Sequence, residues 1–210
     1  QGTRDAISMD NSLQPDAPLP LSVPLPKLGP GDYAHIRGVL DGSALPAGTP
    51  GLDLVGLAGV EVLGALELHG FPGAGIRLGA GSRFNRVASV VVKDSQGPGV
   101  LIEGGAEFNT FFVLGVQDAS GHGIHITGTG TRGNLIASSS TPPLFGGELG
   151  VVRILRAGGV GVRIDGGASD NIVDTYEVRD CASHGIEVVG TGTFRNVVGW
   201  AAGIQGIRHV

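Results

Sequence analysis

Several residue types are scarce in this 210-residue chain, and each shortage argues against a class of protein. A single cysteine, Cys181, rules out an internal disulfide and a zinc site built from several cysteines. Charged residues make up only 16%, too few for long helices with charged faces. No apolar run reaches the length of about 18 residues that a membrane-spanning helix needs. Lysine and arginine form no cluster and the net charge is −5, so we expect no binding to nucleic acid.

Glycine, by contrast, is abundant, with 39 residues beside 12 prolines. Disorder is excluded because 41% of the residues are hydrophobic and the mean hydropathy is +0.22. The glycines have no three-residue period, which excludes collagen. Valine and isoleucine are frequent among the apolar residues, and both favour strands. The composition therefore indicates a β protein.

The sequence contains an internal repeat. Glycine followed by apolar residues at the second and fourth positions begins six segments: 51–54, 75–78, 99–102, 123–126, 161–164 and 185–188. The starts at 51, 75, 99 and 123 are 24 residues apart, as are those at 161 and 185, whereas the unit from 123 to 160 has 38 residues. An asparagine recurs later in five units, at Asn85, Asn109, Asn134, Asn171 and Asn196.

Short apolar alternations separated by Gly, Asn and Ser turns predict a parallel β-helix of about seven coils. The leucine-rich repeat is the other fold with such a period, but its leucine frame is missing. We expect inward aliphatic side chains to stack from coil to coil. We also expect the asparagines to occupy left-handed turn positions and to form a hydrogen-bonded ladder. The aspartates Asp94, Asp118 and Asp180 end strands, where turn capping is the expected role.

The repeat also suggests a domain organisation. Residues 1–33 do not repeat and contain six of the twelve prolines, which predicts an extended N-terminal arm or cap. The β-helix is expected over 34–210, with an insertion loop within 137–159. Gly206–Val210 reads as the start of another coil, so we expect the protein to continue there or to self-associate through this end.

The repeat resembles the right-handed parallel β-helix superfamily, which includes pectate-lyase-like proteins and carbohydrate-binding and sugar-hydrolysis repeats, and the resemblance covers nearly the whole chain. The N-terminal half resembles one bacterial branch of it. The resemblance lies in the leader Gly2-Thr-Arg-Asp-Ala-Ile7, the strand Ile7-Ser-Met-Asp10, and the segments Leu25-Pro-Lys-Leu28 and Ile36-Arg-Gly-Val-Leu-Asp-Gly42. It implies a right-handed coil and a secreted or cell-surface bacterial protein.

One outward face carries the candidate site. Because the second and fourth positions of each first strand point inward, the third and fifth point outward. Ligand-binding candidates on this face are Arg77, Glu103, His125, Arg163 and Asp165, and the weaker catalytic candidates are His125, Arg163, Asp165 and Glu187. Arginine suits a uronate carboxylate, and histidine or a carboxylate suits a general base. The plainer interpretation is an ordinary cross-strand ion pair between Arg163 and Glu187.

Other motifs give weaker indications of function. Gly121-His122-Gly123 resembles part of the polygalacturonase pattern, but the paired aspartates of that pattern are replaced by Gly97 and Pro98. Gly128–Gly133 matches a nucleotide-binding consensus without the helix that such a site needs. His122 and His184 are expected about 10 Å apart, too far to share a metal. We therefore expect no metal and no cofactor.

The sequence thus favours a non-catalytic extracellular or cell-surface module, which acts as a rigid scaffold or as a carbohydrate or adhesion surface. A polysaccharide is the candidate partner. The first alternative is a lyase, hydrolase or epimerase acting on an acidic polysaccharide through the face of Arg77, His125, Arg163 and Asp165. The second is a self-associating structural fibre.

Overall fold

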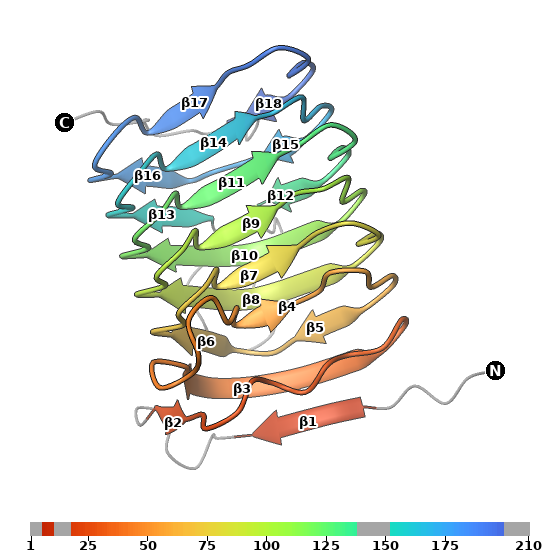
Figure 1. Cartoon of the computed structure of the whole chain (residues 1–210), viewed down its shortest axis with the longest axis vertical. Helices are drawn as coiled ribbons and strands as arrows, with labels where there is room; N and C mark the ends of the chain where they lie inside the picture. Colours follow the sequence, from red (N-terminus) through yellow and green to blue (C-terminus); the bar gives the residue numbers. More distant parts are fainter. Residues whose placement is uncertain (1–5, 11–17, 138–151, 200–210) are drawn as a thin grey trace.

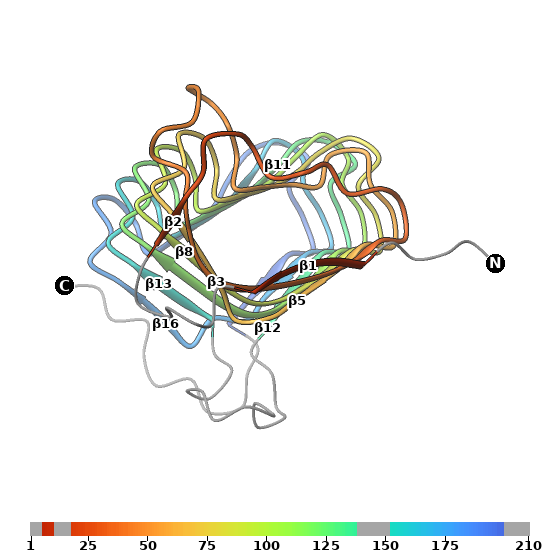
Figure 2. The same cartoon turned by 90° about the horizontal axis from the view of Figure 1, so that it is seen from below.

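The computed structural model describes residues 6–10, 18–137 and 152–199, and this part of the chain is a β-solenoid of about seven turns. The described residues form no helix, and so none that could cross a membrane. Successive coils stack along one axis, with the N-terminal coil at the bottom of Figure 1. Seen along that axis in Figure 2, the coils superimpose around a common interior and climb in a right-handed sense. The predicted all-β parallel solenoid of about seven coils is confirmed, whereas the N-terminal cap stays a prediction.

All strand pairs are parallel and form two sheets. The six-stranded sheet contains, in spatial order, β17 (Ile186–Val188), β14 (Val162–Asp165), β11 (Ile124–Thr127), β9 (Val100–Ile102), β7 (Ile76–Leu78) and β4 (Leu52–Asp53). The twelve-stranded sheet bends around the rest of the coil and contains β1 (Ala6–Asp10), β2 (Leu19–Pro20), β3 (Tyr33–Asp41), β5 (Glu61–Leu63), β6 (Leu66–His69), β8 (Arg86–Lys93), β10 (Thr110–Gln117), β12 (Leu135–Ala137), β13 (Arg153–Leu155), β15 (Ile172–Val173), β16 (Glu177–Arg179) and β18 (Val197–Val198).

The core consists of aliphatic side chains stacked in columns. In the six-stranded sheet Ile76, Val100, Ile124 and Val162 lie in register, and all four are 0% exposed. Each such side chain contributes roughly 1.5–3 kcal/mol by leaving water. The stacking of these columns therefore supplies the main driving force for the fold.

The glycine that begins each unit is required by the lack of space at its position. A Cβ added to Gly99 would lie 2.2 Å from Cγ1 of Val116, which crosses the interior from the opposite strand, and 2.7 Å from the carbonyl oxygen of Gly123 on the next coil. Gly75 has the same relation to Val92 and to the carbonyl oxygen of Gly99. The repeated glycine therefore lets the turn approach both the interior and the next rung.

The asparagine ladder is confirmed. The Nδ2 of Asn85 donates to Oδ1 of Asn109 at 2.9 Å, and Asn109 donates in the same way to Asn134 at 3.0 Å. The ladder continues through Asn171 to Asn196. Each Oδ1 also accepts the backbone N–H of the preceding asparagine in the ladder, so the amides satisfy buried main-chain groups.

The predicted left-handed conformation of the asparagines is wrong. The residue before each of the five asparagines has the positive φ instead: Phe84, Phe108, Gly133, Asp170 and Arg195, at 52–65°. The left-handed residue turns the chain, and the asparagine that follows faces the interior and bonds between rungs. A second left-handed column includes Asp94, Asp118 and Asp180, with φ of 53–56°, in keeping with the expected turn role of these aspartates.

The predicted domain boundaries stay predictions. In the N-terminal arm, β1 and β2 pair with β3 in parallel, and Leu21, Leu25 and Leu28 pack against the core. Most of the expected insertion within 137–159 lies outside the described residues, as does the terminal segment 206–210.

Candidate functional site

The outer face of the six-stranded sheet carries the predicted candidate residues, and those at the third position of each segment form one column. His125 pairs in register with Arg163, and Arg163 with Glu187. On the other side, Leu101 separates His125 from Arg77. Because the fourth unit adds its extra residues elsewhere in the coil, His125 and Arg163 are neighbours in space although 38 positions apart in sequence.

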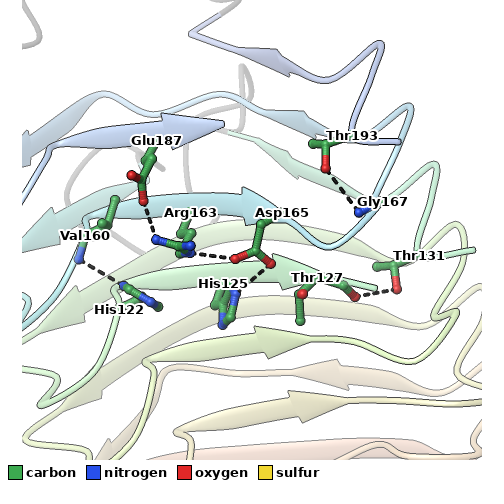
Figure 3. Close-up of polar contacts among 10 residues, drawn as sticks. All are labelled: His122, His125, Thr127, Thr131, Val160, Arg163, Asp165, Gly167, Glu187 and Thr193. Atoms are coloured by element: carbon green, nitrogen blue, oxygen red, sulfur yellow. Dashed lines mark hydrogen bonds and ion pairs between the residues drawn. The ribbon is translucent and has the colours of Figure 1, made fainter. Parts of the chain in front are cut away.

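Four of these side chains form one polar network (Figure 3). The Nε2 of His125 lies 3.1 Å from Oδ1 of Asp165, and the Nε of Arg163 donates to the other carboxylate oxygen at 2.6 Å. The guanidinium of Arg163 also donates through Nη1 to Glu187, which confirms the expected ion pair. All four side chains remain partly accessible, with 18–29% of each exposed. We call His125, Arg163, Asp165 and Glu187 the four-residue network.

Asp165 is the electrostatic centre of this network. Burial by itself would raise the pKa of this carboxyl group, but hydrogen bonds from Thr127, Arg163 and His125 outweigh burial and lower the pKa to about 2. Asp165 is consequently ionised throughout the physiological pH range. Its two oxygens are already hydrogen-bonded to the guanidinium of Arg163 and the imidazole of His125, so this fixed anion holds both side chains in place.

His122 joins the same surface from the turn before β11. Its ring lies edge-on to that of His125, with centroids 4.9 Å apart, and its Nδ1 accepts the N–H of Val160 at 2.9 Å (Figure 3). Burial and the nearby His125 and Arg163 lower the pKa of His122. The imidazole is therefore neutral near pH 7 and carries its proton on Nε2. A side chain at Gly159 would collide with this ring, since its Cβ would lie 2.7 Å from Nδ1.

The remaining ligand-binding candidates lie apart from the network. Arg77 and Glu103 bond to each other, with Nη2 and Oε1 3.0 Å apart. Leu101 stands between this pair and His125 in the column. The structure therefore divides the predicted face into a four-residue network and a separate, more exposed ion pair.

Sequence reasoning missed two participants, His122 and Thr127. His122 was weighed within the Gly121-His122-Gly123 motif and as a metal partner of His184, which lies in the same column with Val160 between them, but not as a neighbour of His125. The available signal was its place three residues before His125, across a tight glycine turn into the strand. Thr127 is the fifth residue of its segment, directly in register with Asp165, so the predicted outward column did include its position.

Two further observations bear on the site. Among the described residues, no group of three or more His, Cys, Asp or Glu side chains is placed to hold a metal ion. Comparisons with protein families, with characterised proteins and with solved structures found no match to this chain. The resemblance to pectate-lyase-like proteins accordingly stays a prediction, and the fold rests on the structure itself.

Proposed function

We propose that this chain is a rigid, non-catalytic module, extracellular or at the cell surface, that binds carbohydrate on the outer face of its six-stranded sheet. The observation that carries the proposal is the four-residue network, in which three adjacent strands hold polar and charged groups at fixed positions on an accessible face. Because each side chain is held by another, little conformational entropy is lost when a ligand binds.

Carbohydrate suits the polar groups of this face. A guanidinium has five N–H donors, and Arg163 uses Nε and Nη1 within the network, which leaves others for a ligand oxygen. Carboxylate lone pairs of Glu187 and the Nε2–H of His122 add an acceptor and a donor. Sugar hydroxyl groups can pair with both kinds of group, and a sugar carboxylate can pair with Arg163.

The ionisation of Asp165 favours binding over catalysis. Glycoside hydrolysis needs a carboxylic acid that holds a proton near neutral pH, and such acids have a raised pKa. The pKa of Asp165 is instead lowered to about 2. One observation does favour the enzymatic alternative, since a carboxylate that orients an imidazole, as Asp165 does for His125, is a common arrangement for a general base.

An Arg163→Ala variant tests the proposal. We expect the wild-type chain to bind an acidic polysaccharide in affinity electrophoresis, and Arg163→Ala to bind at least about tenfold more weakly. Arg156→Ala is the matched control, because Arg156 forms a two-bond pair with Asp118 at 2.7 and 2.8 Å on a turn away from this face.

The same polysaccharides are assayed for new reducing ends and unsaturated products. Cleavage by the wild type that Arg163→Ala abolishes would overturn the non-catalytic assignment. Equal binding by wild type and Arg163→Ala, with circular dichroism confirming that both are folded, would refute this binding face.

A further inference from the structure

Two phenylalanines on a turn of the solenoid are exposed and stacked. The rings of Phe84 and Phe108 lie 5.6 Å apart and 9° from parallel, and the residues are 63% and 43% exposed. Both belong to one column of left-handed residues, which runs Gly31, Gly59, Phe84, Phe108, Gly133, Asp170 and Arg195. The stacked pair makes a contiguous apolar surface, and larger surfaces of this kind mark interaction sites.

The outer faces of the two rings differ. Beyond Phe108, the missing side chain of Gly133 leaves room for the ring, whose Cδ1 would lie 2.5 Å from a Cβ there. Arg132 also lies over this ring, with Cζ 5.8 Å from the centroid. The face of Phe108 away from Phe84 is therefore covered by the protein.

The corresponding face of Phe84 is open. The preceding rungs of the column are Gly59 and Gly31, and a Cβ on Gly59 would meet nothing nearer than the Cα of Gly31 at 3.9 Å. In the neighbouring column, which contains Arg132, the preceding rung has Ala58, whose methyl group is too short to cover a ring. The two preceding rungs of this column therefore bring no side chain against the ring of Phe84, and we call the space beside this open face the notch.

The charges around this notch balance. Up to three sequence positions on either side of Gly31, Gly59 and Phe84, the charged residues are Asp32, Glu61, Arg83 and Arg86. Arg83 is exposed, and among the described residues it forms no ion pair. A ligand here needs a flat apolar face for Phe84 and a hydroxyl group for the adjacent Arg83, but no net charge.

We propose that the open face of Phe84 is a second carbohydrate site, which stacks the C–H face of one neutral hexopyranose ring. This site is independent of the four-residue network, lies on a different part of the coil, and takes a ligand without a carboxylate. Aromatic rings bury a large apolar area at little cost in side-chain entropy, so a single open face can bind such a ring weakly.

Two variants test the notch in opposite ways. Phe84→Ala removes the ring, while Gly59→Asn keeps a residue that tolerates the left-handed conformation and fills the notch beneath the ring. Binding of neutral glucose, galactose and mannose hexasaccharides is measured by titration calorimetry. Phe194→Ala is the matched control, since Phe194 is 49% exposed but its ring is covered by Arg195, 4.7 Å from the centroid.

We expect at least one neutral hexasaccharide to bind, and Phe84→Ala and Gly59→Asn each to weaken binding about tenfold, with Phe194→Ala unchanged. The proposal is wrong if none of the hexasaccharides binds the wild type, or if binding survives both notch variants. Loss of binding in Arg163→Ala alone would assign the neutral glycan to the six-stranded sheet instead. Since the four-residue network is tested with acidic polysaccharide, failure of one proposal leaves the other standing.

Discussion

The asparagine ladder gives the sharpest test of how this fold is stabilised. Replacing Asn109 with alanine removes four hydrogen bonds. The Oδ1 of Asn109 accepts the backbone N–H of Asn85 at 3.1 Å and its Nδ2 at 2.9 Å, and the Nδ2 of Asn109 donates to Oδ1 of Asn134 at 3.0 Å and to the carbonyl of Ser82 at 3.2 Å. Every group concerned is interior, since Asn109 is 0% exposed.

The magnitude follows from these bonds. At about 1 kcal/mol for each net hydrogen bond, the variant loses about 4 kcal/mol of unfolding free energy. The N–H of Asn85 is among the groups left buried without an acceptor. Asn196→Ala is the matched control, because Asn196 is only partly buried at the last described rung and water can replace its bonds. We expect Asn196→Ala to cost about 1–2 kcal/mol.

Urea unfolding followed by circular dichroism measures both free energies, and hydrogen exchange measures the Asn85 amide directly. We expect Asn109→Ala to speed exchange at Asn85 more than at amides on distant rungs. If Asn109→Ala costs no more than Asn196→Ala, or if the Asn85 amide stays as protected as in the wild type, the ladder is not what satisfies the interior backbone.

Two other predictions concern stability. Gly99→Ala should lower the unfolding free energy by about 3 kcal/mol, because its Cβ would lie 2.2 Å from Cγ1 of Val116. The control Gly115→Ala, whose Cβ would lie 3.4 Å from Val91, should change the unfolding free energy by less than about 0.5 kcal/mol. Equal melting temperatures for the two variants would contradict the steric argument. Because folding lowers the pKa of Asp165 from 3.8 to about 2, the ionised carboxylate stabilises the fold by roughly 2 kcal/mol above pH 4, and this contribution is lost as the pH falls from about 4 to about 2. Asp165→Asn should therefore be less stable than the wild type at pH 7 and equal to it near pH 2 in urea unfolding, and a constant difference over that range would refute the assignment.

Much of the site could be predicted because residues one repeat apart in the sequence of a parallel solenoid lie side by side on adjacent coils. Once the glycine-initiated segments are aligned, the column that brings Arg163 beside Glu187 follows, and so does the stacking of Asn85 on Asn109. The direction of each side chain follows from strand alternation. These relations need only the repeat and the geometry of a strand.

Contacts across turns could not be predicted in this way. The edge-on approach of His122 to His125 depends on the path of a glycine turn, and the position of the left-handed residue, one before each asparagine, depends on how that turn closes. The open face of Phe84 depends on Gly59 and Gly31, which occupy the equivalent turn position on the two preceding rungs. The period shows which turn positions are equivalent, but not which of them adopts the left-handed conformation, so it does not specify the path of the turn.

The coil, the inward aliphatic columns and the asparagine ladder follow from the sequence alone, because each is a consequence of a residue type repeated at a constant interval. The ionisation of Asp165, and the grouping of His125, Arg163, Asp165 and Glu187 apart from Arg77 and Glu103, are properties of the folded chain. Those properties depend on distances, burial and hydrogen-bond partners in three dimensions, which the spacing of residues along the chain does not determine.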